Sequence, residues 1–299
     1  FFHSYGLTTC GLTGLAMQAT LVIHHRFQIG TVLELFERHR PTVFPAVPTM
    51  LVALNDRIRS GHGSLAGLDY CISGGAPLPT EVAEEFSRHS GAVVVEGYGL
   101  PEAGPVPHVG PLDGTTRPDT IGLPLPDTQA RIVDIDDHTR TLLPGEVGEL
   151  LVRGPQVMQG YLDDPFATAA VLQDGWLSTG DLATQDADGF FRVVDRLKDL
   201  IITSGFNVYP NEVEEVLRGF SQVADAAIIG IPDAERGQTV KALLALHPGT
   251  QFDPVALEAY LDHRLARHKR PREVEVVHGD LPRNFLGKVL RRHLREDAA

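Results

Sequence analysis

The sequence predicts an α/β protein, in which a parallel sheet with covering helices is followed by a small β-rich subdomain and then by a C-terminal α+β domain. Three observations support this class. Short apolar runs alternate with amphipathic segments over the first hundred residues, short β-type runs punctuated by Pro, Gly and Asp follow from about residue 105, and the last hundred residues mix the two patterns. Alternation of the first kind is typical of parallel strands that are connected by helices.

The predicted α/β region covers residues 1–124. Helices are expected at 31–40, 50–59 and 81–89, and strands at 42–47, 69–73 and 92–96. Two glycine-rich turns follow strands directly, at Ser73–Pro77 and Gly97–Gly99. Because ligands of such sheets bind beyond the carboxyl ends of the strands, these turns are the first candidates for a binding site.

The β-rich subdomain is predicted at residues 125–195 and the C-terminal domain at residues 196–299. Strands of the subdomain are expected at 129–134, 148–154 and 190–195. In the last domain, Asn211 with Glu214 three positions later predicts a capped helix start, and Asp253-Pro254 predicts a second one. The first of these helices should bury one apolar face, made by Val213, Val216, Leu217 and Phe220.

Composition excludes several classes of partner. The net charge of -13 argues against a nucleic-acid binder, because phosphate backbones are bound through clustered Lys and Arg. No segment has the roughly 20 apolar residues of a transmembrane helix, and the apolar opening at 1–23 is expected to be buried core. That opening lacks the features of a signal peptide and begins with Phe1, so we expect the chain to be cut from a longer protein.

Only two cysteines are present, Cys10 and Cys71. They lack a CxxC spacing, so neither a disulfide framework nor a structural zinc site is predicted, and both are expected to lie in the core. A reducing cytoplasm fits this usage.

Four segments, taken in order, carry a chemical signal. They are EGYGLPE (96–102), GWLSTGDL (175–182), VVDRLKDLIITSGFNVYPNEVEEVL (193–217) and PRNFLGKVLRR (282–292). In this order and spacing they resemble the adenylate-forming superfamily of acyl-CoA synthetases, luciferases and nonribosomal-peptide adenylation domains. The resemblance extends from Phe1 to about Arg292. It implies ATP and CoA as co-substrates, Mg²⁺ as the metal ion, and a C-terminal domain that is mobile.

The resemblance implies a catalytic role for Lys288 and Glu102. Joining a carboxylate to the α-phosphate of ATP brings two negative groups together, so cations must gather there. Lys288 follows a glycine in an N-x-x-G-K stretch and is expected to bridge the two groups, whereas Glu102 is expected to hold the Mg²⁺. Pro101 stands where the family usually has a phosphate-binding Thr, which removes one hydrogen bond.

The same resemblance implies a nucleotide site. Tyr98 is expected to stack on adenine, with a packed core tyrosine as the alternative. Asp181 is expected to accept the ribose hydroxyls and Arg196 to donate to the same sugar, although a lone Asp in a turn is usually a turn residue. The remaining backbone positions expected beside the nucleotide are Gly74, Gly75, Ala76 and Gly99.

Further residues are implied to serve the second half-reaction and the acyl group. Lys198 occupies the place of the hinge about which the C-terminal domain swings. Ser204, Gly205 and Phe206 are expected to line the route of the pantetheine thiol. His3 resembles a residue that gates the acyl pocket, and an ordinary packed histidine is the alternative.

The sequence therefore predicts an ATP-dependent acid:CoA ligase that forms an acyl-adenylate and then an acyl-CoA thioester, on a fatty or other apolar carboxylic acid. Two alternatives stay open. One is an acyl-AMP ligase that loads a carrier protein. The other is a nucleotide- or acyl-binding fragment without catalysis, because the Ser/Thr/Gly-rich phosphate loop of the family is missing from these residues.

Overall fold

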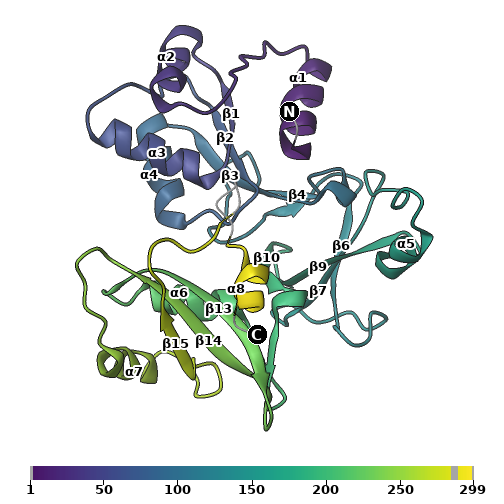
Figure 1. Ribbon diagram of the computed structural model, residues 1–299. Helices are drawn as coiled ribbons and strands as arrows, with labels where there is room; N and C mark the ends of the chain where they lie inside the picture. Colours follow the sequence, from purple (N-terminus) through teal and green to yellow (C-terminus); the bar gives the residue numbers. More distant parts are fainter. Residues whose placement is uncertain (1–2, 284–288, 298–299) are drawn as a thin grey trace. The chain divides into compact units, whose positions relative to one another are not determined.

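The computed structural model describes residues 3–283 and 289–297, which form two compact units (Figure 1). The first unit extends to Thr179 and includes Ala183–Val193, and the second takes Gly180–Leu182 and the residues from Val194 onward. Each unit is mixed α/β, which confirms the predicted fold class. The boundaries expected at residues 124 and 195, and the mobility of the last domain, stay predictions.

A sheet of five strands organises the first unit. Its strands follow one another in the order β1 (Val43–Ala46), β2 (Tyr70–Gly74), β3 (Val93–Tyr98), β4 (His108–Val109) and β5 (Leu123–Pro124). The first three pair in parallel and the last two pair antiparallel. All three strands expected in this region are therefore present, and they are parallel as predicted.

Three helices pack together against this sheet, on one side of it in Figure 1. They are α2 (Ile29–His39), α3 (Pro48–Arg59) and α4 (Thr80–Ser90). Phe36, Leu51 and Phe86, one from each helix, share a core with Cys71 of β2. Phe86 is fully buried, and its ring stacks on that of Phe44 at a centroid distance of 6.5 Å. The helical periodicity read from the sequence thus marks the faces that cover the sheet.

The β-rich part of the chain forms a second sheet, in the order β10-β9-β7-β6 with β8 paired to β9. The strands are β6 (Gln129–Val133), β7 (Gly148–Arg153), β8 (Leu172–Gln173), β9 (Trp176–Gln185) and β10 (Phe191–Arg196). One short helix, α5 (Pro165–Val171), precedes β8. The three strands expected in this region are found within a residue or two of their predicted bounds.

The second unit is built on a third sheet, in the order β12-β11-β14-β13 with β15 paired to β14. Its strands are β11 (Ile201–Thr203), β12 (Phe206–Val208), β13 (Val223–Asp233), β14 (Gly237–Leu246) and β15 (Glu273–Val276). Its helices are α6 (Pro210–Arg218), α7 (Pro254–Asp262) and α8 (Arg291–Asp297), and a 3₁₀ turn, η3 (Leu197–Asp199), precedes β11.

Alternation along β13 assigns these helices to opposite faces of the third sheet. Ile228 packs with residues of α6 and α7, such as Leu217 and Leu261. Its neighbour Ile229 packs instead with Leu294 of α8. Because successive side chains of a strand point to opposite faces, α8 covers the face that α6 and α7 leave open.

The predicted helix start at Asp253 is confirmed, whereas the prediction of a capped helix start at Asn211 is wrong. The Asp253 carboxylate accepts hydrogen bonds from the backbone N–H groups of Val255 and Ala256, each at 3.0 Å. Helix α6 begins at Pro210, and its N-cap residue, Tyr209, makes no side-chain cap. The first-turn N–H of Asn211 donates instead to the carboxylate of Asp195 at 2.8 Å.

Glu214 does not close a capping box. Its side chain accepts a hydrogen bond from the N–H of Ile228 at 2.9 Å, on the free edge of β13. The apolar face expected for this helix is correct, because Val213, Leu217 and Phe220 are buried.

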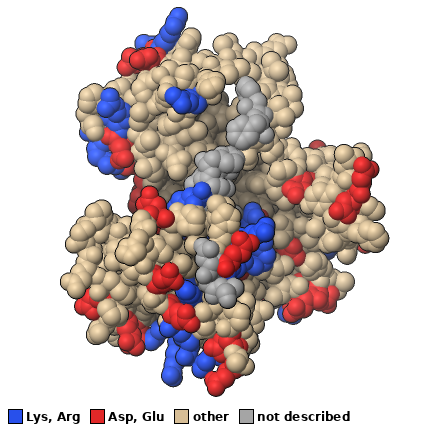
Figure 2. Space-filling model, viewed as in Figure 1, with Lys and Arg blue, Asp and Glu red and all other residues tan. Residues whose placement is uncertain are grey.

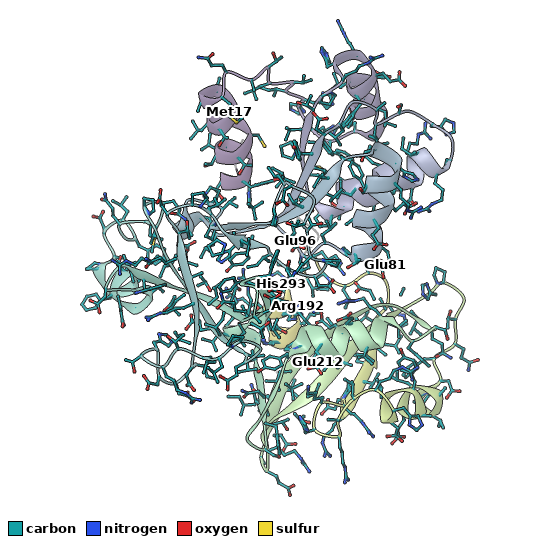
Figure 3. The ribbon with its side chains drawn as sticks, turned by 180° about the vertical axis from the view of Figure 1, so that it is seen from behind. Met17, Glu81, Glu96, Arg192, Glu212 and His293 are labelled. Carbon is teal, nitrogen blue, oxygen red and sulfur yellow. The ribbon has the colours of Figure 1, made fainter. Side chains whose placement is uncertain are left out.

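The apolar opening of the chain is not buried core, contrary to the expectation. It forms η1 (Gly6–Leu12) and α1 (Thr13–Ala16), and none of the described residues up to Ile23 is buried. Leu15 and Met17 are 67% and 75% exposed; Figure 3 labels Met17 on this segment. Tyr5 connects the segment to the sheet, because its hydroxyl donates to the carbonyl of Ile72 at 2.7 Å. Cys10 is accordingly only half-buried, whereas Cys71 is fully buried as expected.

A search of the described residues for a membrane-crossing helix finds none of sufficient length and apolar character.

His108 is the most unusual polar residue of the first unit. It is completely buried on β4, and neither ring nitrogen has a hydrogen-bond partner among the described residues. Its ring lies between those of Tyr98 and Phe191, at centroid distances of 6.0 and 4.9 Å. Burial lowers the pKa of His108 from 6.5 to about 3, so the imidazole is neutral in the folded protein at neutral pH.

His108 should therefore weaken the fold as the solution becomes acidic. The unfolded chain takes up a proton near pH 6.5 and the folded chain does not, so stability falls as the pH drops below that value. Between pH 7 and pH 5 the loss attributable to His108 is about 2 kcal/mol. We expect His108→Gln to escape this loss, which urea unfolding of both proteins at the two pH values would measure.

The stability of the wild type must be compared with that of His108→Gln, because the titration of Glu96 changes stability with pH in the opposite direction. Burial raises the pKa of Glu96 to about 7, so its contribution to stability is lost as the pH rises. Glu96 is unchanged in the variant and drops out of the difference. Equal changes in stability for the two proteins would show that His108 does not titrate as described.

Candidate active site

The carboxyl ends of β2 and β3 bring the two predicted turns to one edge of the first sheet. The parallel register pairs Ser73 with Glu96 and Gly74 with Gly97, so the chain leaves both strands at the same level. Gly75 has φ +84°, which favours glycine. At Gly99 an added Cβ would collide with the carbonyl oxygen of Pro105. Two of the predicted glycines are thus required by the backbone at this edge.

Tyr98 is the last residue of β3. Its surroundings have features of both roles considered for it, stacking on adenine and packing in the core. Its ring is half-buried and packs against the apolar cluster around Phe191 and Val152. Its partner across the antiparallel pair is His108, which meets it edge to face. A ring supported from behind and partly exposed suits stacking on a planar base. The assignment of Tyr98 to adenine stays a prediction.

Glu96 is a residue of this edge that the sequence reasoning did not single out (Figure 3). It is half-buried, and its carboxylate accepts a hydrogen bond from the N–H of Leu78 at 3.4 Å, in the segment that follows the first turn. Desolvation raises the pKa of Glu96 to about 7. The available signal was a carboxylate at the end of the apolar run AVVVE, where a buried strand should carry no charge.

Glu102 lies just beyond the same edge, on the 3₁₀ turn η2 (Pro101–Ala103). Its Oε1 accepts a hydrogen bond from the hydroxyl of Tyr161 at 2.9 Å, and its backbone carbonyl accepts one from the N–H of Met158 at 2.8 Å. In the described part of the chain no hydrogen bond engages Oε2. A held carboxylate with one open oxygen fits Mg²⁺, which takes one or two carboxylates together with phosphate oxygens. No group of three or more potential metal ligands exists among the described residues, so Glu102 would need oxygens from a ligand.

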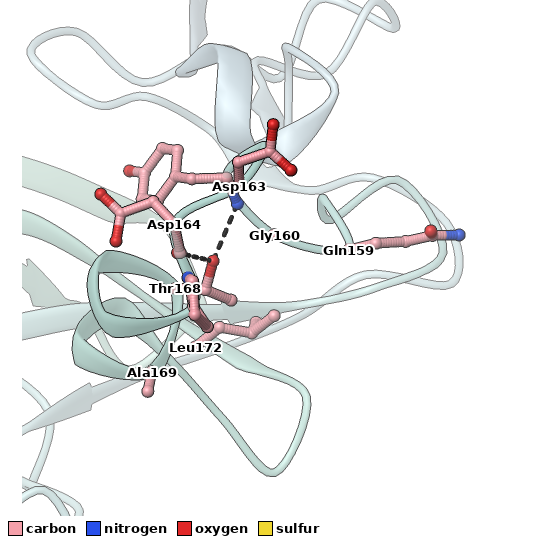
Figure 4. Close-up of a pocket in the computed structure, with 9 residues that line it drawn as sticks. Gln159, Gly160, Asp163, Asp164, Thr168, Ala169 and Leu172 are labelled. Atoms are coloured by element: carbon pink, nitrogen blue, oxygen red, sulfur yellow. Dashed lines mark hydrogen bonds between the residues drawn. The ribbon is translucent and has the colours of Figure 1, made fainter.

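A shallow, open hollow lies beside Tyr161 (Figure 4). The hydroxyl of Thr168 organises it by accepting from the N–H of Tyr161 at 2.9 Å and donating to the carbonyl of Asp164 at 2.8 Å. None of the predicted site residues lines this hollow. The loop that lines this hollow carries Tyr161, whose hydroxyl donates to Glu102.

Asp181 and Arg196 are brought together in the second unit, on strands β9 and β10. Arg196 Nε lies 3.3 Å from Asp181 Oδ1, with the Asp181 side chain 9% exposed and that of Arg196 45% exposed. Gly180, which precedes Asp181 within β9, has φ +70°, a backbone conformation that favours glycine. A buried carboxylate held by an accessible guanidinium offers both an acceptor and donors to a diol.

The residues assigned to the hinge and the thiol route are each exposed in the second unit. Lys198 is exposed on η3. Ser204 and Gly205 connect β11 to β12 as a two-residue turn, with φ of +50° and +79°. Phe206 is 55% exposed and stacks on His268 at 4.6 Å.

Two further predicted residues complete the account. His3 is half-buried, and its Nδ1 accepts a hydrogen bond from the N–H of Tyr5 at 3.2 Å. Lys288 lies outside the described residues, so its role stays a prediction. Figure 2 shows acidic and basic side chains intermixed on the face in view, in a chain of net charge -13.

Comparison with known proteins gives these features a common context. The chain is 41% identical over 297 residues to a long-chain-fatty-acid–CoA ligase of Bacillus subtilis, covering 99% of this chain and 53% of the relative. It is 40% identical to a feruloyl-CoA synthase of an Amycolatopsis species, covering 98% of this chain and 59% of that protein. The chain thus spans about half the length of the curated relatives it matches.

Solved structures of two enzymes superpose on nearly the whole of this chain. The ATP-bound MatB of Rhodopseudomonas palustris superposes with a TM-score of 0.89 at 33% identity, over 99% of this chain and 58% of that one. The o-succinylbenzoate CoA synthetase MenE of Bacillus subtilis, in complex with ATP and magnesium, gives 0.85 at 34% identity, over 98% and 59%. The family model described as "AMP-binding enzyme" matches residues 1–162, and that of the "AMP-binding enzyme C-terminal domain" matches residues 212–288. The chain belongs to the AMP-binding enzyme family.

Proposed function

We propose that these residues form part of an ATP-dependent acid:CoA ligase, which makes an acyl-adenylate and then an acyl-CoA thioester. The observation that carries this proposal is the shared carboxyl edge of β2 and β3, where Gly74–Ala76 and Tyr98–Gly99 meet. Such an edge supplies backbone space and an aromatic face for a nucleotide. The relatives named as CoA ligases support the acceptor, and those named for long-chain fatty acids support an apolar acid.

In the first half-reaction a carboxylate oxygen attacks the α-phosphorus of ATP and pyrophosphate leaves. Asp181 and Arg196 would hold the ribose, and Tyr98 would hold the base. Mg²⁺, held by Glu102, would supply positive charge for the phosphates when bound. Lys288 would bridge the carboxylate and the α-phosphate, where negative charge accumulates.

In the second half-reaction the thiol of CoA attacks the acyl carbonyl and AMP leaves. The exposed turn Ser204–Gly205 and the Phe206 ring would guide the pantetheine arm. Lys198, at η3, would be the residue at which the backbone turns between the two reactions. His3 would lie beside the acyl group. The free thiols of Cys10 and Cys71 support a reducing, cytoplasmic location as part of this proposal.

The function is tested on the protein as encoded, with any residues that precede Phe1. We expect AMP and a thioester to form when it is given ATP, Mg²⁺, CoA and a panel of fatty and aryl acids. Replacing CoA by a phosphopantetheinylated carrier protein separates the ligase from an acyl-AMP ligase that loads a carrier. Formation of neither product with any acid would refute both and leave a binding module.

Lys288→Ala should separate the half-reactions. If Lys288 bridges the carboxylate and the phosphate, its loss removes a charge needed only in adenylation. We expect ATP–pyrophosphate exchange to fall by about a thousandfold, whereas thioester formation from supplied acyl-adenylate changes by less than about threefold. Arg292→Ala, which removes an 87% exposed cation of the same unit, serves as the comparison. Equal rates in wild type and Lys288→Ala for both steps would remove Lys288 from the mechanism.

Asp181→Asn should weaken the binding of ATP. The change keeps the size of the side chain but removes the charge that would accept the ribose hydroxyls and that pairs with Arg196. We expect KM for ATP to rise about tenfold, with KM for the acid unchanged. Glu235→Gln, at an 83% exposed side chain of the same unit, is the control. An unchanged KM for ATP would contradict the ribose assignment.

A further inference from the structure

A buried cluster of charges connects the last helix of the second unit to its sheet. Arg291, at the start of α8, is 9% exposed. Its Nη2 lies 2.7 Å from Glu214 Oε1, and its Nη1 lies 3.6 Å from Asp199 Oδ2. Both carboxylates are almost completely buried. Arg295, one turn later, adds a hydrogen bond to Asp199 at 2.8 Å.

The cluster continues to the start of the second unit through Asn211. Arg291 donates to Asn211 Oδ1 at 2.8 Å, and the Asn211 amide donates to the carbonyl of Val194 at 3.1 Å. The backbone N–H of Asn211 donates to Asp195, which also accepts from the N–H of Arg196 at 2.8 Å. One guanidinium is thereby linked to both sides of Lys198, at residues 194–196 and at Asp199.

Packing alone does not require these charges. Leu294 already fixes α8 on the sheet by apolar contact with Ala227 and Ile229, and Figure 1 draws α8 beside β13. Withdrawing an arginine and two carboxylates from water is costly, and replacing such groups by apolar ones often leaves stability unchanged. What the charged groups add is direction, because a planar guanidinium with several partners fixes its helix in one orientation.

We infer that Arg291 is a positioning residue for adenylation, which holds the start of α8 in register with η3. This inference rests on the proposed function. Lys288 stands three positions before Arg291 in the sequence. The residues that flank 284–288 are held together on both sides. Arg283 forms a β-bridge with Val289, and the N–H of Leu290 donates to the carbonyl of Pro282 at 2.8 Å. When the backbone turns at Lys198, Arg291 keeps the C-terminal segment with Asp199 as one body, whereas the contacts of Asn211 with Val194 and Asp195, on the other side of Lys198, must then break.

The test compares three variants of the protein as encoded. Arg291→Lys keeps one charge but cannot reach Glu214, Asn211 and Asp199 together. Arg295→Ala removes one contact of Asp199 and leaves Arg291 in place. Arg292→Ala is the matched control, because Arg292 is adjacent and 87% exposed, and its ion pair among the described residues is with Glu296 of its own helix. For each variant, ATP–pyrophosphate exchange, thioester formation from supplied acyl-adenylate and the urea midpoint are measured.

We expect Arg291→Lys to lower the exchange rate at least about tenfold, while thioester formation stays within about threefold, because a misplaced group harms the step it serves. Arg295→Ala should show a smaller loss of the same kind, and Arg292→Ala none. A parallel fall in both rates together with the urea midpoint, or no change in their ratio, would overturn the inference. Absence of both activities from the wild type would instead refute the proposed function, and the inference with it.

Discussion

The parallel register of β2 and β3 is the constraint on which the candidate site depends. Because Gly74 lies opposite Gly97, the two strands end together and their turns must share one edge. Everything proposed for the first unit follows in sequence from those ends: the Gly75 turn, the Tyr98 ring and, one turn later, Glu102. The backbone of this edge tolerates little change, since a side chain at Gly99 would strike the carbonyl of Pro105.

In the second unit a single carboxylate has a comparable role. Asp195 is 1% exposed, and burial raises its pKa despite two backbone N–H donors. It starts α6 from outside the helix and at the same time holds the backbone of Arg196. The start of the helix, the ribose candidate Arg196 and the turn that carries Lys198 therefore share one support.

The sequence was most informative where a structure is local. Helical and strand periodicity located α2 to α4 and β1 to β3, and the Asp253 cap was readable because donor and acceptor are two or three residues apart. The reading failed where partners are remote. Asp195 and Asn211 are separated by 16 positions, Tyr161 and Glu102 by 59, and Arg291 and Glu214 by 77. Asn211 and Glu214 have the spacing of a capping box. Each instead forms hydrogen bonds with residues remote in the sequence, Asn211 with Asp195 and Glu214 with Ile228. The prediction that the apolar opening is buried core was wrong for a related reason. The hydrophobicity of a segment does not show whether another surface covers that segment.

Charge divides the proposed chemistry between the two units. The residues at the edge of the first unit include two carboxylates, Glu96 and Glu102, and a histidine that burial keeps neutral. None of these can offset the charge of a triphosphate. The positive groups proposed for the reaction, Arg196 and Lys288, both come from the part of the chain beyond Val194. Under the proposed function, the first unit therefore supplies the ring for the base and holds the metal, whereas the ribose contacts and the cations for adenylation come from the second unit.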